Sequence, residues 1–391
     1  MQPVQIMPKV YWVGAIDYQL RYFHGYLTPR GTTYNAYLIV DEEAVTLVDT
    51  VKKPFFDQML ERIRQVVDPE CIDHLVINHV EMDHAGSIPS LLQVAKNARS
   101  FISPRGKKAL ERYQAAPDKL EAVPTGHELK TGKLTLKFVH TPMVHWPDSM
   151  VTYVPERKLL LPNDGFGQHI ASPERFVDEV GYDKVLEEAL KYYANIVMPY
   201  GDQVKGVLDT VRELPIEMIA PSHGLIWRSH IGDIVEEYTK WATHQTEKRA
   251  LIVYDTMWGS TEKLMYALRQ GLEDKGIPTV IRSLQANHIS DIMPDVLRSR
   301  LILLGTPTLN NGMLPNMGEF LTYVKGLRPK QRIGFAFGSH GWGGQGARQT
   351  HEAIEEMGWD APLPVLATQY LPDAQELEKA RATAHQLADM L

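Results

Sequence analysis

The stretch Asn78–Gly86 reads NHVEMDHAG and decides how the first half of this sequence is interpreted. The apolar run Leu75–Ile77 just before it is typical of a buried strand that delivers the chain to this stretch. Alternating positions of an extended segment project to one side, and a further histidine follows as the chain turns. Four ligand-type side chains can therefore converge on one small volume and predict a metal site: His79, Glu81, Asp83 and His84.

The segments around this stretch combine hairpins with helices. Strand-like runs cover 10–15, 34–40 and 44–49, and the last two flank the polar turn Asp41–Glu43, which predicts a β-hairpin. Apolar residues then recur at helical spacing over 55–67. This mixture indicates a layered α/β domain with a mixed sheet.

Length and composition narrow the class of protein. The 391 residues suggest about two domains, and 44% hydrophobic with 23% charged residues is close to globular averages. The formal charge of −7, without a basic block, makes nucleic acid an improbable partner. Cys71 is the only cysteine, which excludes an intramolecular disulfide or a cysteine-ligated cluster and fits a reducing cytoplasm. We expect neither a membrane helix nor a signal peptide.

Three further candidate ligands end apolar runs. His145 lies in HTPMVHWPDSM (140–150), Asp164 in LLLPNDGFGQH (159–169) and His223 in IAPSHG (219–224). Strand ends are where functional sites are commonly built. Each residue alone is equally consistent with a structural role.

The pattern changes near residue 248, and we predict domains at 1–248 and 249–391. An apolar strand at 250–254 is followed by a helix with Leu264, Leu268 and Leu272, and Gly276 ends it. Strand runs recur at 279–282, 301–304, 333–337 and 364–367, with helical stretches between them and a last helix at 374–391. Fully apolar strands alternating with helices predict a parallel, doubly wound sheet.

Three loops after strands of the second half suit a phosphate-bearing cofactor. The first, DTMWGST (255–261), offers hydroxyls and backbone N–H groups at a helix start, although an ordinary helix cap would look similar. Because G-x-G-x-x-G is missing after the first strand, FMN is favoured over a dinucleotide. The first loop resembles the phosphate loop of flavodoxins, and this resemblance implies FMN contacts from all three loops: Thr256, Met257, Trp258, Gly259, Ser260 and Thr261; Pro307, Thr308, Leu309, Asn310 and Asn311; Ser339, His340, Gly341, Trp342, Gly343 and Gly344.

Over nearly its whole length the sequence resembles the flavodiiron proteins, also called rubredoxin:oxygen oxidoreductases. The resemblance implies a metallo-β-lactamase-like αββα sandwich followed by a flavodoxin-like doubly wound sheet. It implies one iron on His79, Glu81 and His145, with Asp164 as a bridge to a second iron. The second iron would take Asp83, His84 and His223, although in some members the residue matching His84 turns away.

The same resemblance implies a function and partners. The family reduces O₂ to water or NO to N₂O at the diiron centre, while FMN relays electrons from an external donor such as rubredoxin, or a reduced deazaflavin in methanogen relatives. A head-to-tail homodimer, or a dimer of dimers, would bring the flavin of one chain to the iron of the other. His24 matches a family position near the open face of the irons, and Tyr193 is a second candidate to donate a proton to bound oxygen. A structural role for both is equally consistent with the sequence.

The residue types also favour iron. Zinc hydrolases of this fold carry histidine where Glu81 stands, and three carboxylates with four imidazoles form a harder, more anionic site. Two Fe²⁺ ions against three carboxylates leave one positive charge, which a bridging hydroxide would neutralise. Such ligation suits a metal that changes oxidation state, which zinc cannot do. A zinc hydrolase fused to a flavodoxin module, and a non-catalytic gas sensor, stay as alternatives.

Overall fold

The computed structural model describes residues 2–113 and 119–391. The chain forms two compact units, the first made of Met1–Tyr192 and Tyr200–Thr239 and the second of Tyr193–Pro199 and Lys240–Leu391. The second unit thus begins before the boundary at 248 that the sequence suggested, and it also takes in a short segment from the first half of the chain.

A seven-stranded sheet forms the first layer of the first unit, in the order β1-β2-β7-β8-β9-β10-β11. The predicted hairpin is confirmed, because β7 and β8 pair antiparallel, whereas β8 to β11 run parallel. The parallel strands release the chain at one edge, and His79 follows the end of β9. The bounds are β1 (Val4–Met7), β2 (Val10–Trp12), β7 (Tyr37–Val40), β8 (Val45–Val48), β9 (His74–Ile77), β10 (Arg99–Ile102) and β11 (Leu120–Ala122).

A five-stranded sheet faces the first, in the order β12-β13-β14-β15-β16. Its strands are β12 (Glu128–Lys130), β13 (Thr135–His140), β14 (Met150–Val154), β15 (Leu159–Leu161) and β16 (Met218–Ile219). Two small hairpin pairs lie outside both sheets: β3 (Ala15–Asp17) with β6 (Thr32–Tyr34), and β4 (Tyr22–Phe23) with β5 (Tyr26–Leu27).

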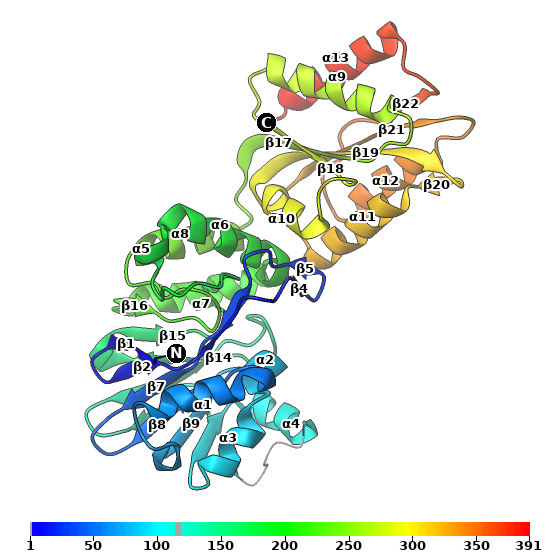
Figure 1. The fold of residues 1–391 in the computed structure, drawn as a ribbon. Coiled ribbons are helices and arrows are strands. Elements are labelled where there is room, and N and C mark those ends of the chain that lie inside the picture. Colours follow the sequence, from blue (N-terminus) through cyan, green and yellow to red (C-terminus); the bar gives the residue numbers. More distant parts are fainter. Residues whose placement is uncertain (1, 114–118) are drawn as a thin grey trace. The chain divides into compact units, whose positions relative to one another are not determined.

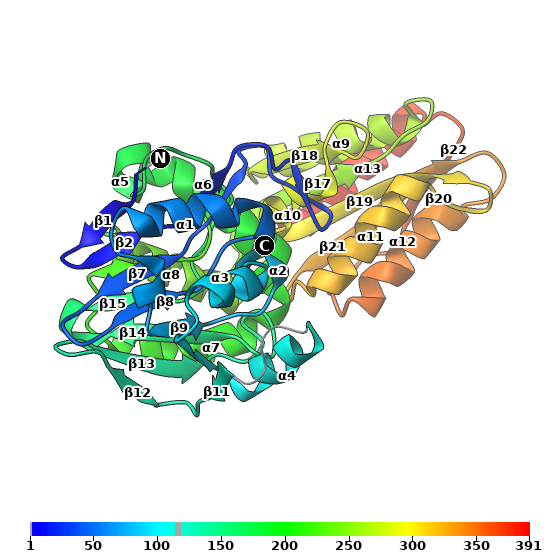
Figure 2. The ribbon, with the colours of Figure 1, turned by 60° about the horizontal axis from the view of Figure 1, so that its bottom comes forward.

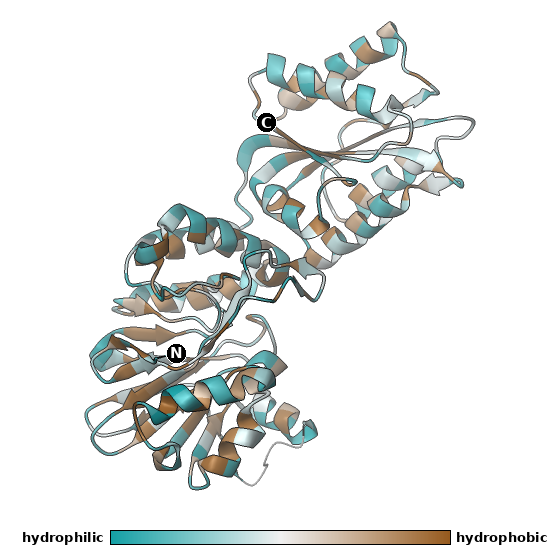
Figure 3. Ribbon diagram, viewed as in Figure 1, coloured by the Kyte–Doolittle hydropathy of each residue, from teal (hydrophilic) through white to brown (hydrophobic). Residues whose placement is uncertain are grey.

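The alternation of side chains along each strand builds the layers. In β9, Leu75 and Ile77 pack with the helices on one side, whereas Val76 lies in a second core between the two sheets. Figure 3 shows these strands as predominantly hydrophobic. The helices of this half are α1 (Phe56–Arg64), α2 (Met82–Ala85), α3 (Ile88–Val94), α4 (Pro104–Arg112), α5 (Val177–Val180), α6 (Tyr182–Tyr192), α7 (Gly201–Glu213) and α8 (Ile231–Ala242).

Figures 1 and 2 show helices on the outer faces of this pair of sheets, so the expected αββα sandwich is confirmed. Helices α1, α3 and α4 cover the seven-stranded sheet. Between α6 and α7 the chain passes through a π-helix, Tyr193–Val197, and a 3₁₀ turn, Met198–Tyr200.

The second unit contains a parallel sheet in the order β18-β17-β19-β21-β22, with β20 paired antiparallel to β19. In chain order this is 2-1-3-4-5, the flavodoxin-like arrangement, and the doubly wound sheet predicted from the sequence is confirmed. The strands are β17 (Glu247–Tyr254), β18 (Thr279–Ser283), β19 (Ser299–Leu309), β20 (Gly312–Met313), β21 (Ile333–His340) and β22 (Leu366–Gln369).

Within this unit, Figure 1 shows α9 (Ser260–Asp274) and α13 (Ala374–Ala388) on one face of the sheet, and α10 (Ile289–Arg298), α11 (Pro315–Leu327) and α12 (Gln345–Glu356) on the other. Among the described residues, no helix is both long and apolar enough to cross a membrane.

Candidate metal centre and flavin site

The structure brings together all seven predicted metal-ligand side chains of the first unit. One prediction was wrong: the segment after β9 is extended only as far as Glu81, because Met82–Ala85 form the short helix α2. The turn of that helix sends Asp83 and His84 to a second group of ligands, separate from the group that His79 and Glu81 join.

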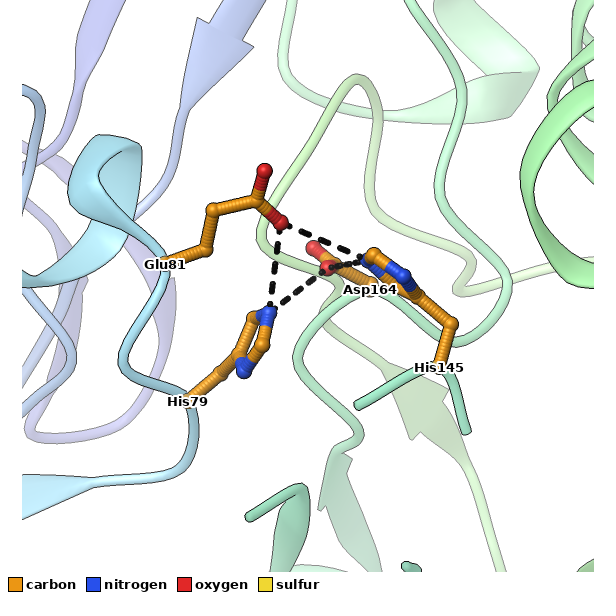
Figure 4. A group of neighbouring side chains, drawn as sticks. All are labelled: His79, Glu81, His145 and Asp164. Atoms are coloured by element: carbon orange, nitrogen blue, oxygen red, sulfur yellow. Dashed lines mark hydrogen bonds and ion pairs between the residues drawn. The ribbon is translucent and has the colours of Figure 1, made fainter. Parts of the chain in front are cut away.

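The first group consists of His79, Glu81, His145 and Asp164, whose ligand atoms all lie within 4.8 Å of one another. Figure 4 shows the four side chains pointing at one another, with His79 and Glu81 on one segment of chain and His145 and Asp164 on others. His79 Nε2 lies 3.4 Å from Glu81 Oε2 and 3.7 Å from Asp164 Oδ2. His145 Nε2 lies 3.0 Å from the same oxygen of Asp164.

The second group consists of Asp83, His84 and His223. His223 Nε2 is 3.2 Å from Asp83 Oδ2, and His84 Nε2 is 3.4 Å from Asp83 Oδ1. The other oxygen of Asp164, Oδ1, lies 3.2 Å from His84 Nε2 and 3.6 Å from His223 Nε2. One carboxylate therefore presents one oxygen to each group, which is the geometry a bridging ligand needs.

Several buried polar atoms of the cluster have no hydrogen-bond partner, although they lie at ion-pair distances from one another. They are His79 Nε2, both carboxylate oxygens of Asp83 and both ring nitrogens of His84. Buried polar atoms without partners are costly in a folded protein. Four of these five atoms lie within 3.7 Å of other ligand atoms of the cluster. The donor set fits a pair of metal ions.

The charges of the metal-free cluster stabilise one another. Burial disfavours a charged His84, but the carboxylates of Asp83 and Asp164 outweigh burial and raise its pKa to about 9. Burial likewise opposes ionisation of both aspartates, yet the neighbouring histidines hold their pKa values below the usual range. The proton on His84 thus occupies a position that a metal ion would take, and metal binding would release it.

Two histidine ligands are oriented by contacts to the ring nitrogen that does not face the cluster. The Nδ1 atom of His79 lies 3.0 Å from the carboxylate of Asp148, which also accepts from Val80 N at 2.9 Å. His223 Nδ1 donates to the carbonyl of Thr33 at 2.7 Å. A ring whose Nδ1–H is engaged in this way directs the lone pair of Nε2 at the metal. Sequence reasoning missed Asp148, although it stands in the segment quoted for His145.

The bridging carboxylate has its own support. Ser222 Oγ donates to Asp164 Oδ1 at 2.5 Å. Sequence reasoning missed this residue as well, since a serine before a histidine is no signal by itself.

The buried carboxylate of Asp49 holds the loops of the site in place through hydrogen bonds to residues that are not metal ligands. Asp49 accepts from Asn78 N at 2.8 Å and from the side-chain amides of Asn78 and Asn163, each at 3.2 Å. These residues follow β8, β9 and β15, the strands that lead into the site. Burial raises the pKa of Asp49 above its ordinary value.

The predicted proton donors lie in different surroundings. His24 is 72% exposed at its side chain, and its Nε2 lies 3.4 Å from Glu81 Oε1. The Tyr193 ring packs against Trp241 in the second unit. Its neighbour Tyr192 lies near His223 instead, with ring centroids 6.1 Å apart. The Nδ1 atom of His169, which lies between Tyr192 and His223, is 2.8 Å from Thr32 Oγ1.

The second unit has a cavity of about 540 Å³ at the carboxyl ends of its strands. It is lined by most of the predicted FMN contacts: Met257, Trp258, Ser260, Pro307, Thr308, Leu309, Asn310, Asn311, Ser339, His340, Gly341, Trp342 and Gly343. Tyr370, after β22, also lines it and was missed. The predicted contacts Thr256, Gly259, Thr261 and Gly344 do not line it.

The cavity fits a planar ring system with a phosphate. Trp258 and Trp342 are 92% and 90% exposed at its rim, although exposed indoles are unusual in a folded protein. The first loop leads into α9 through Gly259, whose φ of +82° favours glycine. Thr256 Oγ1 accepts from Gly259 N at 3.1 Å, and Thr261 Oγ1 contacts Ser339 Oγ at 2.8 Å. Thr256 therefore stabilises the turn within the first loop, and Thr261 joins the start of α9 to β21.

Comparison with known proteins agrees with this architecture. Residues 32–224 match the family described as ODP family beta lactamase, and residues 252–383 match Flavodoxin. A nitric oxide reductase from Moorella thermoacetica is 43% identical, with 99% of this chain and 98% of the relative covered.

Two solved structures are similar over the whole chain. The rubredoxin oxygen:oxidoreductase from Desulfovibrio gigas has a TM-score of 0.97 and 39% identity, covering 100% of this chain and 98% of that one. The flavodiiron protein from Giardia intestinalis has a TM-score of 0.96 and 32% identity, covering 100% and 96%.

A metallo-β-lactamase-like unit with a two-metal ligand set, followed by a flavodoxin-like unit, defines a metal- and flavin-dependent oxidoreductase. The chain belongs to the flavodiiron protein family. Its cofactors are FMN and two iron ions, and the residues described above fit both.

Proposed function

We propose that this chain reduces O₂ to water, NO to N₂O, or both, at two irons held by the seven clustered side chains. The observation that carries the proposal is Asp164, which presents Oδ2 to the first ligand group and Oδ1 to the second. The relatives named as nitric oxide reductase and rubredoxin oxygen:oxidoreductase support both gases. They do not favour the zinc hydrolase considered from the sequence.

In this proposal His79, Glu81 and His145 would hold one iron, Asp83, His84 and His223 would hold the other, and Asp164 would offer one carboxylate oxygen to each. When bound, the irons and FMN supply the electrons that the reduction of the gas consumes. The protein contributes orientation through Asp148 and the Thr33 carbonyl, which fix the rings of His79 and His223.

Reduction of O₂ to water also consumes protons, and we assign one donor position to His24. Its Nε2 faces Glu81 while most of the side chain stays in solvent. A solvent-exposed imidazole can take up a proton from water and pass it to a neighbouring group. The role of Tyr193 stays a prediction.

The electron donor is a separate small protein of the rubredoxin type, as the name of the Desulfovibrio gigas structure suggests. The chain would act in the cytoplasm as a head-to-tail homodimer or a dimer of dimers. The single cysteine supports the location in the cytoplasm, and the family resemblance supports the assembly.

The test is metal and flavin analysis followed by gas consumption. Protein loaded anaerobically should hold about two irons and one FMN per chain, and it should consume O₂ or NO steadily with reduced rubredoxin. Asp164→Ala should lose iron and activity but keep FMN. Zinc without iron in active protein, or full iron and activity in Asp164→Ala, would contradict the proposal.

A further inference from the structure

A small apolar cavity of about 30 Å³ lies in the first unit, and two of its lining residues are neighbours in sequence of metal ligands. Helix α7 forms one wall with Val204, Val207 and Leu208, and Val151 and Leu160 of strands β14 and β15 contribute to the lining. The FMN cavity is a different one, because it is lined by loops of the second unit.

The lining excludes polar ligands. It contains no carboxylate, ammonium or imidazole group, and its side-chain polar atoms are the hydroxyls of Thr141 and Tyr238. A water molecule needs two to four polar partners in such a space, and apolar cavities generally stay dry. A molecule that gains by entering must therefore be small and apolar.

Two walls of the cavity are continuous with metal ligands. Val144 directly precedes His145, and Gly165 directly follows Asp164, so each lining residue is one peptide unit, about 3.8 Å between Cα atoms, from a ligand. Val144 and Val207 are half-buried, whereas Phe166, Val204 and Leu208 are buried. The lining thus includes both fully buried side chains and side chains that solvent partly reaches.

We infer that this cavity is a docking site for the diatomic gas substrate, O₂ or NO, next to the metal centre. The inference rests on the proposed function, because the proposed occupant is the gas that the enzyme reduces. Both gases are uncharged, weakly solvated and small. A group of about methylene size gains roughly fourfold in partition when it leaves water for an apolar site, so the cavity would raise the local gas concentration by about that factor.

Xenon tests occupancy without turnover. Crystals of the full chain, pressurised with xenon, should show the atom between α7 and Phe166. Val207→Phe, which places a ring in the cavity, should abolish that xenon site, and Val207→Ala should raise its occupancy. Val94→Phe is the matched control, because Val94 is a half-buried helix valine of the same unit that does not line the cavity.

Steady-state kinetics test the role. Val207→Phe should raise KM for O₂ and NO about fourfold, leave kcat at saturating gas unchanged, and keep two irons and FMN. Val94→Phe should change neither constant. If Val207→Phe fails to fold, the xenon occupancy and KM of Val207→Ala decide instead, with KM expected to stay at or below the wild-type value.

The outcomes separate this inference from the proposed function. Active wild-type protein without xenon in the cavity, or a filled cavity with unchanged KM for both gases, overturns the docking site alone. Failure of the loaded wild-type protein to consume either gas overturns the proposed function, and the inference with it.

Discussion

Replacing Asp148 by asparagine should weaken iron binding without disturbing the flavin. The carboxylate is buried and accepts two hydrogen bonds, from His79 Nδ1 at 3.0 Å and Val80 N at 2.9 Å. Asparagine keeps the shape but removes the charge, and hydrogen bonds to charged groups contribute about 1.5–3 kcal/mol. Loss of a partner behind a metal-bound histidine typically lowers metal affinity about 10- to 100-fold. Because a tenfold change in affinity corresponds to about 1.4 kcal/mol, the hydrogen-bond energy and the expected loss of metal affinity agree.

The assay is competition for iron with a chelator of known affinity, under anaerobic conditions, with FMN content measured in parallel. Glu188→Gln is the matched control, because Glu188 is a buried carboxylate of the same unit that pairs with Arg30 and touches no ligand. We expect Asp148→Asn to release iron at about 10- to 100-fold lower chelator activity than the control. Equal retention of iron in the two variants would refute the reasoning.

Four further predictions concern the two sites. His79→Ala should lose iron but retain FMN, as shown by metal analysis and flavin absorbance. Ser222→Ala should keep both irons but lower their midpoint potential, because Asp164 without this hydrogen bond donates more strongly to ferric iron; an unchanged potential in spectroelectrochemical titration would contradict this. Trp342→Ala should raise the Kd of FMN roughly two- to tenfold by loss of ring contact, measured by fluorescence titration, with iron content unaffected. In metal-free protein the neighbouring carboxylates raise the pKa of His84 to about 9, above the ordinary histidine value of about 6.5. Protonation of His84 therefore stabilises the metal-free fold fully below about pH 6.5, and this stabilisation is lost as pH rises through about 9. A Tm of the metal-free protein that does not fall between these two pH values would contradict the prediction.

Local signals were sufficient to predict the parallel sheet of the second half and a mixed sheet with helices in the first, whereas the αββα sandwich was predicted only through the family resemblance. Apolar strands, helical spacing and the turn at Asp41–Glu43 each lie within one short window. The ligand segment was recognisable for the same reason. The conformation of this segment beyond Glu81 could not be predicted, because the same four residues are compatible with an extended segment and with a helical turn.

Residues that act only through tertiary contacts could not be predicted from local sequence patterns. The ligands supported by Asp148, Ser222 and Thr33 lie far away in the chain, and the local sequence around these three residues gives no sign of that role. Tyr370 joins the flavin cavity only because β22 lies beside β21. Adjacent helical residues point about 100° apart, so choosing between Tyr192 and Tyr193 requires the phase of the helix, which the π-helical segment shifts.

The tether at Asp49 has a consequence for the metal-free protein. It joins the chain after β8 to Asn78 and Asn163 through hydrogen bonds that involve none of the seven ligands. Because these bonds need no metal ion, they can hold the ligand-bearing loops together in the metal-free protein as well as in the loaded one.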